Sequence, residues 1–178
     1  MTKKIIKIDG SMLEGGGAIL RNSVALSALY QQPIDVFNIR ANREKSGLRS
    51  QHAKVIESIG KICDAEIKGV FVGSERISFI PGELKGGEYE IDIGTAGSLT
   101  LLLLALIPVA TKCPSKVKLL LTGGTDVNWS PPLDYLRYVY KPMMEKLGVE
   151  ITLCVGRRGH YPKGGGKISC DIEPVIVQ

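Results

Sequence analysis

The stretch that decides the fold is Ile39–Ala53, IRANREKSGLRSQHA, where an apolar strand-like run ends and a long helical pattern begins. Four of its residues are cationic and one is acidic: Arg40, Arg43, Lys45 and Arg49 against Glu44. Arginine offers a planar pair of donors to phosphate oxygens, and unpaired N–H groups at a helix start add partial positive charge. The stretch therefore suits a phosphate-rich ligand, although a solvated basic turn has the same composition.

Strand-like and helix-like segments alternate around this stretch, in an order that occurs twice. The first set has strands over 3–9, 33–39, 66–72 and 75–80, and helices over 18–30 and 47–65. The second set has strands over 88–93, 116–122, 149–155 and 167–172, and helices over 98–111 and 131–147. The order strand–helix–strand–helix–strand–strand predicts an α/β (α+β) protein made of tandem two-layer sandwiches. We expect the first repeat in residues 1–82 and the second in residues 83–178.

Three helices have apolar residues at helical spacing, which predicts the faces that they bury. For the helix over 18–30 these are Ile19, Val24, Leu26 and Leu29; for that over 47–65 they are Leu48, His52, Val55, Ile56, Ile59 and Cys63; for that over 131–147 they are Leu136, Val139, Met143 and Leu147. Each helix is expected to pack this face against a sheet.

Composition gives weaker constraints. The chain has 178 residues, of which 44% are apolar and 23% charged, as in globular domains. A formal net charge of +5 mildly favours polyanion partners, while 6% aromatic residues argue against an extended stacking platform. The start, MTKKIIKIDG, lacks the apolar core of a signal peptide, and the most apolar run, 99–110, is too short to span a bilayer. We expect a cytoplasmic protein without membrane contact.

The four cysteines show no metal-binding spacing. None belongs to a C-x-x-C pair, and each lies in or beside an apolar stretch: Cys63, Cys113, Cys154 and Cys170. We expect buried thiols in a reducing compartment and no zinc site.

A second loop rich in glycine follows the first strand. Glu14 precedes three successive glycines, and Arg21 comes one helical turn later. Consecutive glycines let a backbone approach a ligand closely. The loop is neither a Walker A motif, since no G-K-[ST] follows, nor a dinucleotide fingerprint, since Leu20 replaces the last glycine. Glu14 is open to two roles, binding a metal or ribose hydroxyl, or pairing with Arg21.

Other polar and aromatic residues leave their roles open. Gln51 is expected beside the basic loop, while His52 begins an apolar stripe, as buried histidines more often do than catalytic ones. Trp129 or Pro131 offers a flat face to a base, or simply marks a helix start. The glycine-rich segment 156–166 has the composition of a flexible hairpin loop. No nucleophile–base–acid set is visible.

Five stretches in this order resemble the RNA 3′-terminal phosphate cyclase family and cover nearly the whole chain. They are IDGSMLEGGGAILRNSVALS, IRANREKSGLRSQH, IGTAGSLTLLLLALIP, TGGTDVNWSPPLDYL and GHYPKGGG. The resemblance implies ATP-dependent conversion of an RNA 3′-phosphate into a 2′,3′-cyclic phosphate, through an enzyme–AMP intermediate on a histidine and with Mg²⁺ or Mn²⁺. It also implies a fold of three such repeats with a small inserted domain.

The resemblance also assigns roles to individual residues. Arg21, Arg40 and Arg43 would hold phosphates of RNA and ATP, with support from Gln51 and His52. Glu14 would bind the metal. Pro131 would pack the adenine, and Leu104 stands at a nucleotide-contacting position where many members have glutamine.

The nucleophilic histidine of the family lies in a C-terminal third that has no counterpart here, and neither His52 nor His160 matches its motif. We therefore expect an N-terminal portion, without the third repeat and the inserted domain, that is inactive alone and forms oligomers or dissolves poorly. Two alternatives are a non-catalytic cyclase-like protein that binds ribosomal RNA precursors and, more remotely, an enolpyruvyl transferase.

Overall fold

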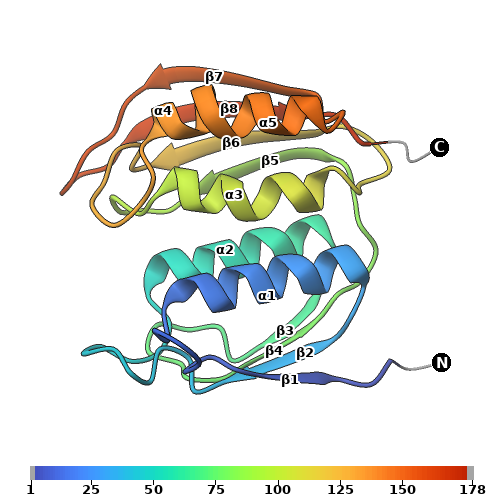
Figure 1. Ribbon diagram of the computed structural model, residues 1–178, viewed down its shortest axis with the longest axis vertical. Helices are drawn as coiled ribbons and strands as arrows, with labels where there is room; N and C mark the ends of the chain where they lie inside the picture. The colour runs from blue at the N-terminus through green and yellow to red at the C-terminus, as the bar shows by residue number, and fades with distance from the viewer. Residues whose placement is uncertain (1–2, 176–178) are drawn as a thin grey trace. The chain divides into compact units, whose positions relative to one another are not determined.

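The computed structural model describes residues 3–175, which belong to two compact units, Met1–Leu84 and Lys85–Gln178. Each unit contains one four-stranded sheet, and strands and helices follow in the same order in both (Figure 1). The predicted α/β (α+β) class is therefore confirmed. No helix within residues 3–175 is both long and apolar enough to cross a membrane.

The first unit is a sheet covered on one face by two helices (Figure 1). Its elements are β1 (Ile6–Asp9), α1 (Gly17–Tyr30), β2 (Ile34–Phe37), α2 (Ser50–Ile62), β3 (Glu66–Lys68) and β4 (Ile77–Ile80). The strand order is β1-β2-β4-β3, with β1 and β2 parallel and the other pairs antiparallel. Because β1 and β2 run in parallel, the loops that follow them emerge at the same edge of the sheet.

The core of the first unit follows the two periodicities of strand and helix. Every second residue of β2 and β4 is buried: Ile34, Val36, Ile77 and Phe79. The predicted face of α2 is confirmed, since all six of its residues are buried. In α1 only Val24 of the four predicted residues is buried: Leu26 is half exposed, and Ile19 and Leu29 are partly exposed. The buried face runs through Leu20, Val24 and Ala28 instead.

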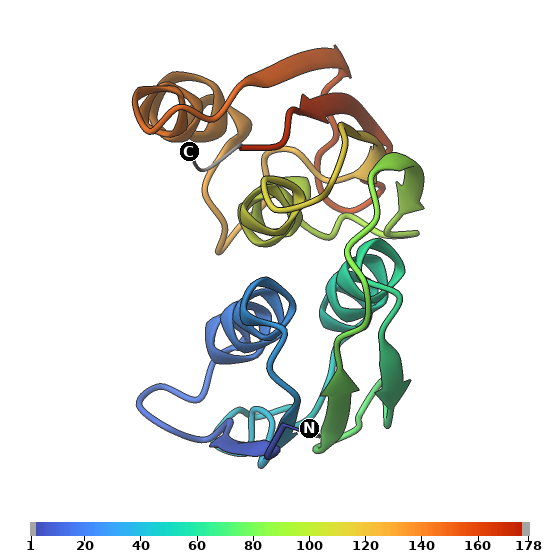
Figure 2. The same cartoon turned by 90° about the vertical axis from the view of Figure 1, so that its right-hand side faces the viewer.

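The second unit repeats the topology with longer strands. Figure 2 views the helices of each unit end-on. Its elements are β5 (Gly87–Asp92), α3 (Leu99–Ala110), β6 (Val117–Gly123), α4 (Leu133–Tyr135), the π-helical turn η1 (Leu136–Tyr140), α5 (Lys141–Lys146), β7 (Ile151–Arg157) and β8 (Gly166–Ile172). The strand order is β5-β6-β8-β7, and β5 and β6 are parallel. The hydroxyl of Ser98 caps α3 by accepting from the N–H of Leu101, at 3.1 Å.

The helix predicted over 131–147 differs from expectation in continuity and in burial. It consists of α4, η1 and α5, and of its four predicted core residues only Leu136 is buried. Val139, Met143 and Leu147 are exposed. A π-helical turn is wider than an α-helical one, so residues that share a face at 3.6-residue spacing diverge beyond it.

Two further expectations are wrong. The strand predicted over 66–72 ends at Lys68, because the following turn pairs with the basic stretch: the N–H of Gly73 donates to Leu48 O at 2.8 Å. Phe71 and Val72 are consequently exposed. Cys154 is also exposed, because it points away from the core on β7, whereas the other three thiols are buried. Burial raises the pKa of the Cys113 thiol to about 11.

Candidate functional site

Two loops meet at the carboxyl ends of β1 and β2, and short polar side chains tie them together. Asp9 Oδ1 accepts from the N–H and the hydroxyl of Ser11 at 2.9 and 2.7 Å, and from Asn38 Nδ2 at 3.3 Å. These donors, Ser11 foremost, hold the pKa of Asp9 below its usual value. Asn42 Nδ2 in turn donates to Ser11 O at 2.9 Å. The glycine-rich loop and the basic loop therefore form one structure.

Glu14 pairs with Arg43 across these loops. Arg43 Nη2 lies 3.2 Å from Glu14 Oε2, so the expected alternative of a Glu14–Arg21 pair is wrong. Both side chains are solvent-exposed, and an exposed pair of this kind contributes only about 0–1 kcal/mol. A cation can therefore draw Glu14 away, and an anion can draw Arg43 away, at little cost.

Arg21 lies behind this pair, one turn into α1. Its guanidinium is partly buried, and burial lowers its pKa. No carboxylate within residues 3–175 comes within 4.0 Å of it. A Cβ atom at Gly17 would lie 2.3 Å from His52 Nε2 and 3.1 Å from Arg21 Nη1. The absence of a side chain at position 17 thus lets Arg21 and His52 lie against the glycine-rich turn.

Arg40 holds the basic loop together through hydrogen bonds to the loop's own backbone. Its Nη1 donates to Lys45 O at 2.7 Å and to Gly47 O at 2.9 Å, and its φ of 56° places it in the left-handed region. Burial, and then the charges of Arg49 and Arg43, lower its pKa. The guanidinium has five N–H donors, so this role in the loop leaves others for a ligand.

His52 is held neutral in the first turn of α2. Its ring is only 4% exposed, and Nδ1 accepts from the N–H of Arg49 at 3.1 Å, in the manner of a capping box. Burial, followed by the charges of Arg40, Arg21 and Arg49, lowers its pKa to about 4. The neighbouring Gln51 is partly exposed, and among the described residues its amide makes no hydrogen bond.

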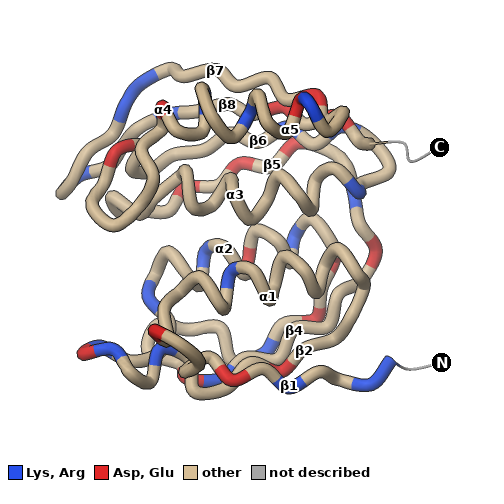
Figure 3. Tube along the Cα trace, in the orientation of Figure 1, with Lys and Arg blue, Asp and Glu red and all other residues tan. Residues whose placement is uncertain are grey.

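The structure brings six predicted site residues together in the first unit: Glu14, Arg21, Arg40, Arg43, Gln51 and His52. Figure 3 shows how Lys and Arg positions gather in the loop between β2 and α2. Leu104 and Pro131 belong to the second unit, where Leu104 is partly exposed on α3 and Pro131 precedes α4.

Sequence reasoning missed three contributors to this site. They are Asp9, Asn38 and Asn42. Asp9 ends β1 and Asn38 directly follows β2, and an Asp or Asn at the end of a strand is a recognisable turn signal, whereas Asn42 lies inside the loop. Arg49 was counted among the cations of the stretch but given no role, and the structure places its charge near both Arg40 and His52.

A metal could be held here only with help from a ligand. Within residues 3–175 no three His, Cys, Asp or Glu side chains gather as a metal site would require. Mg²⁺ is, however, commonly held by one or two carboxylates together with substrate phosphates and water. Glu14, exposed and weakly paired, fits that arrangement as a single protein ligand.

The class that this fold and site define is a repeated α/β protein with a cationic, glycine-lined loop site. A family model for RNA 3′-terminal phosphate cyclase matches residues 12–178, and the chain belongs to that family. The resemblance seen in the sequence is thereby confirmed.

Individual relatives agree with the family model. A protein of Ignicoccus hospitalis is 51% identical over 171 residues, which is 96% of this chain and 48% of that protein. One of Pyrococcus furiosus is 52% identical over 172 residues, 97% of this chain and 50% of its own length. One of Nitrosospira multiformis is 49% identical over 170 residues. All three are named RNA 3′-terminal phosphate cyclase, and the chain spans about half the length of these relatives.

Proposed function

We propose that this chain carries the phosphate-binding and metal-binding part of an RNA 3′-terminal phosphate cyclase, which converts an RNA 3′-phosphate into a 2′,3′-cyclic phosphate at the expense of ATP. ATP supplies an AMP group to the 3′-phosphate with release of pyrophosphate, and the neighbouring 2′-hydroxyl, losing its proton, then displaces AMP as the ring closes. The residues of this chain bind and orient the phosphates in that scheme.

The observation that carries the proposal is the state of Arg21. A guanidinium that is partly buried without a carboxylate partner has lost hydration without recovering it from an ion pair. An anion entering between the glycine-rich turn and α1 would restore that interaction. Phosphate fits, because it accepts two parallel N–H bonds from one guanidinium.

The neighbouring residues have complementary roles. Arg43 turns from Glu14 to a phosphate oxygen, and Arg40 adds its remaining donors from the closed loop. Gln51 and His52 support the phosphates from the first turn of α2. Glu14, once released, would hold a Mg²⁺ or Mn²⁺ ion, which would supply positive charge against the phosphates. Pro131 packs an adenine, and Leu104 stands beside the nucleotide.

Neither histidine of the chain is assigned the covalent step. The ring of His52 is buried and its Nδ1 is occupied by the Arg49 N–H. We expect a 3′-phosphorylated RNA, ATP and Mg²⁺ to give no cyclic phosphate with this chain alone. Adenylate found on His52 or His160 would contradict that expectation.

Binding tests the proposal directly, because it requires no turnover. We expect the chain to bind a 3′-phosphorylated oligoribonucleotide more tightly than its 3′-hydroxyl form, measured by fluorescence anisotropy with a 5′ label. Arg21→Met should abolish that preference, lowering affinity for the phosphorylated form about tenfold or more, since a hydrogen-bonded charge contact is worth about 1.5–3 kcal/mol.

Lys61→Met is the matched control. Lys61 is an exposed cation in the last turn of α2, so its loss changes net charge equally but leaves the site intact. If wild type binds both RNA ends equally, the site does not read a terminal phosphate. Equal binding without any effect of ATP would favour a non-catalytic RNA-binding relative instead.

A further inference from the structure

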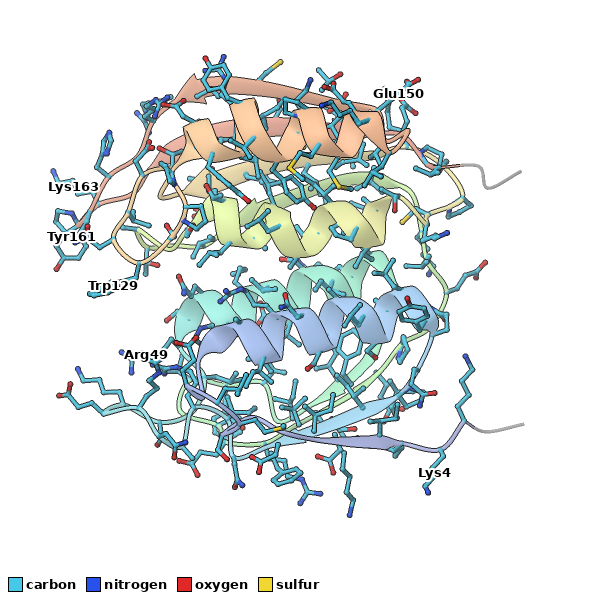
Figure 4. All side chains as sticks on the ribbon, viewed as in Figure 1. Lys4, Arg49, Trp129, Glu150, Tyr161 and Lys163 are labelled. Carbon is cyan, nitrogen blue, oxygen red and sulfur yellow. The ribbon has the colours of Figure 1, made fainter. Side chains whose placement is uncertain are left out.

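Two aromatic side chains of the second unit are displayed to solvent at the tips of two loops. Trp129 is 100% exposed in the loop 124–132 between β6 and α4, and Tyr161 is 80% exposed in the loop 158–165 between β7 and β8. Both side chains, with Lys163, project from the same end of this unit (Figure 4). Tryptophan and tyrosine combine a large apolar ring with a polar group, which suits them to interaction surfaces.

The bases of these loops are joined tightly. The Thr125 hydroxyl accepts from the N–H of Gly159 at 2.9 Å, and the Thr125 N–H donates to Gly159 O at 2.8 Å. Arg158 Nη1 donates to both carboxylate oxygens of Asp126, at 3.1 and 3.0 Å, and its Nη2 bonds Asp134. The aromatic tips are therefore presented from a fixed base.

The charge around the tips is positive. The acids nearest to Trp129 in sequence, Asp126 and Asp134, are both paired with Arg158. Arg157, Lys163 and Lys167 are exposed, and no carboxylate among the described residues lies within 4.0 Å of them. Arg157 is oriented by two bonds from its guanidinium to Gly165 O, at 2.9 and 2.6 Å.

We propose that these two loops bind single-stranded RNA, with unpaired bases stacked on Trp129 and Tyr161 and backbone phosphates against Lys163, Arg157 and Lys167. The inference rests on the proposed function for the choice of RNA as the polynucleotide. It goes beyond that function by assigning a base-stacking surface in the second unit, separate from the phosphate site of the first.

The residue types in these two loops favour single-stranded RNA over a protein as the partner. Isolated flat rings between cations suit nucleotides, whose bases stack and whose phosphates are anionic, and stacking accepts any base. A protein interface would instead present a continuous apolar centre, which glycine-rich loops with exposed cations do not provide.

Trp129 is the only tryptophan of the chain, so tryptophan fluorescence reports on this loop. We expect an oligoadenylate with a 3′-hydroxyl end to quench that fluorescence, and an abasic oligomer of equal length and charge to leave it unchanged. Equal quenching by the abasic oligomer would show a charge effect and overturn the proposal.

Variants test the same point through a labelled RNA and anisotropy. Trp129→Ala and Tyr161→Ala should each weaken binding of the 3′-hydroxyl oligoadenylate at least about fivefold, as alanine substitution of stacking aromatics does. Trp129→Phe should retain most of the affinity. Tyr138→Ala, which removes an exposed tyrosine from η1, is the control and should bind as wild type.

The outcomes separate the two proposals. Wild-type affinity in both alanine variants, with circular dichroism unchanged, would overturn the stacking surface even if the 3′-phosphate preference persists. Base-dependent quenching without any 3′-phosphate preference would support the stacking surface and contradict the phosphate site of the first unit.

Discussion

The fold keeps the side chain of His52 uncharged. The unfolded chain takes up a proton here near the ordinary histidine pKa of 6.5, whereas the folded chain resists it down to about 4. Neutral His52 therefore costs no stability above pH 6.5, and the folded state becomes progressively less favourable as the pH falls from 6.5 to 4. The difference of pKa corresponds to at most about 3 kcal/mol.

Replacing the His52 ring tests this dependence of stability on pH. His52→Asn keeps a side-chain acceptor near the Arg49 N–H but cannot titrate. We expect the free energy of unfolding, from urea denaturation at pH 7 and pH 4.5, to fall about 2 kcal/mol less in the variant than in wild type over this interval. An identical fall in both proteins would mean that other groups, such as the carboxylates of Asp9 and Asp35, account for the acid sensitivity.

At the scale of elements, the basic loop is fixed by its backbone contacts with the loop before β4. The N–H of Ile39 donates to Glu75 O at 3.0 Å, and the N–H of Leu48 donates to Ser74 O at 2.9 Å. Gly47 has a φ of +72°, and a Cβ atom there would lie 2.2 Å from Gly73 O. The basic loop is thus positioned by a close approach of two backbones.

Gly47→Ala should force these loops apart. We expect a loss of about 2 kcal/mol or more in the free energy of unfolding, since left-handed strain and a backbone clash act together. Gly73→Ala is the matched control: its φ is +89°, but its Cβ would meet nothing within 4 Å, so only the strain remains. Equal losses in the two variants, measured in urea, would refute the close approach.

The sequence predicted helices and strands more accurately than it predicted which side chains contact one another. The buried face of α2 was readable because it keeps helical spacing from Leu48 to Cys63. The π-helical turn η1 was not predictable, because no residue type is specific to such a turn. The prediction that Val139 and Met143 belong to a core was therefore wrong.

In the candidate site, too, the residue types were predictable and the contacts between them were not. That cations crowd the start of α2 is visible in the residue types alone. That Glu14 pairs with Arg43 depends on how the loops after β1 and β2 meet, since the two residues are far apart in sequence. That Arg40 donates two hydrogen bonds to the backbone of its own loop depends on an irregular conformation, which no periodicity encodes.

At the scale of the whole molecule, both units expose apolar side chains. In the second unit these are Tyr138, Val139, Met143 and Leu147 along η1, α5 and its end. In the first unit a cavity of about 310 Å³ between β1 and α1 is lined by exposed Ile6, Leu26 and Tyr30. Contiguous exposed apolar surface favours association.

We therefore expect the chain to self-associate, with a mass from light scattering that rises with protein concentration. The double variant Met143→Gln and Leu147→Gln should shift the mass toward the monomer, because it removes apolar surface without changing charge. Val72→Gln, at an exposed apolar position of the first unit, is the control. A wild-type chain that stays monomeric at all concentrations would contradict the expectation.

The repeated strand order has a consequence for the history of the chain. The loop 38–49, between β2 and α2, carries the cluster of basic residues, and the loop 124–132, between β6 and α4, exposes Trp129. These loops occupy the same topological position, each after the second strand of its sheet. Tandem duplication of one ancestral unit would give two copies of this loop, one diverging toward the sugar–phosphate chain of a nucleic acid and the other toward its bases.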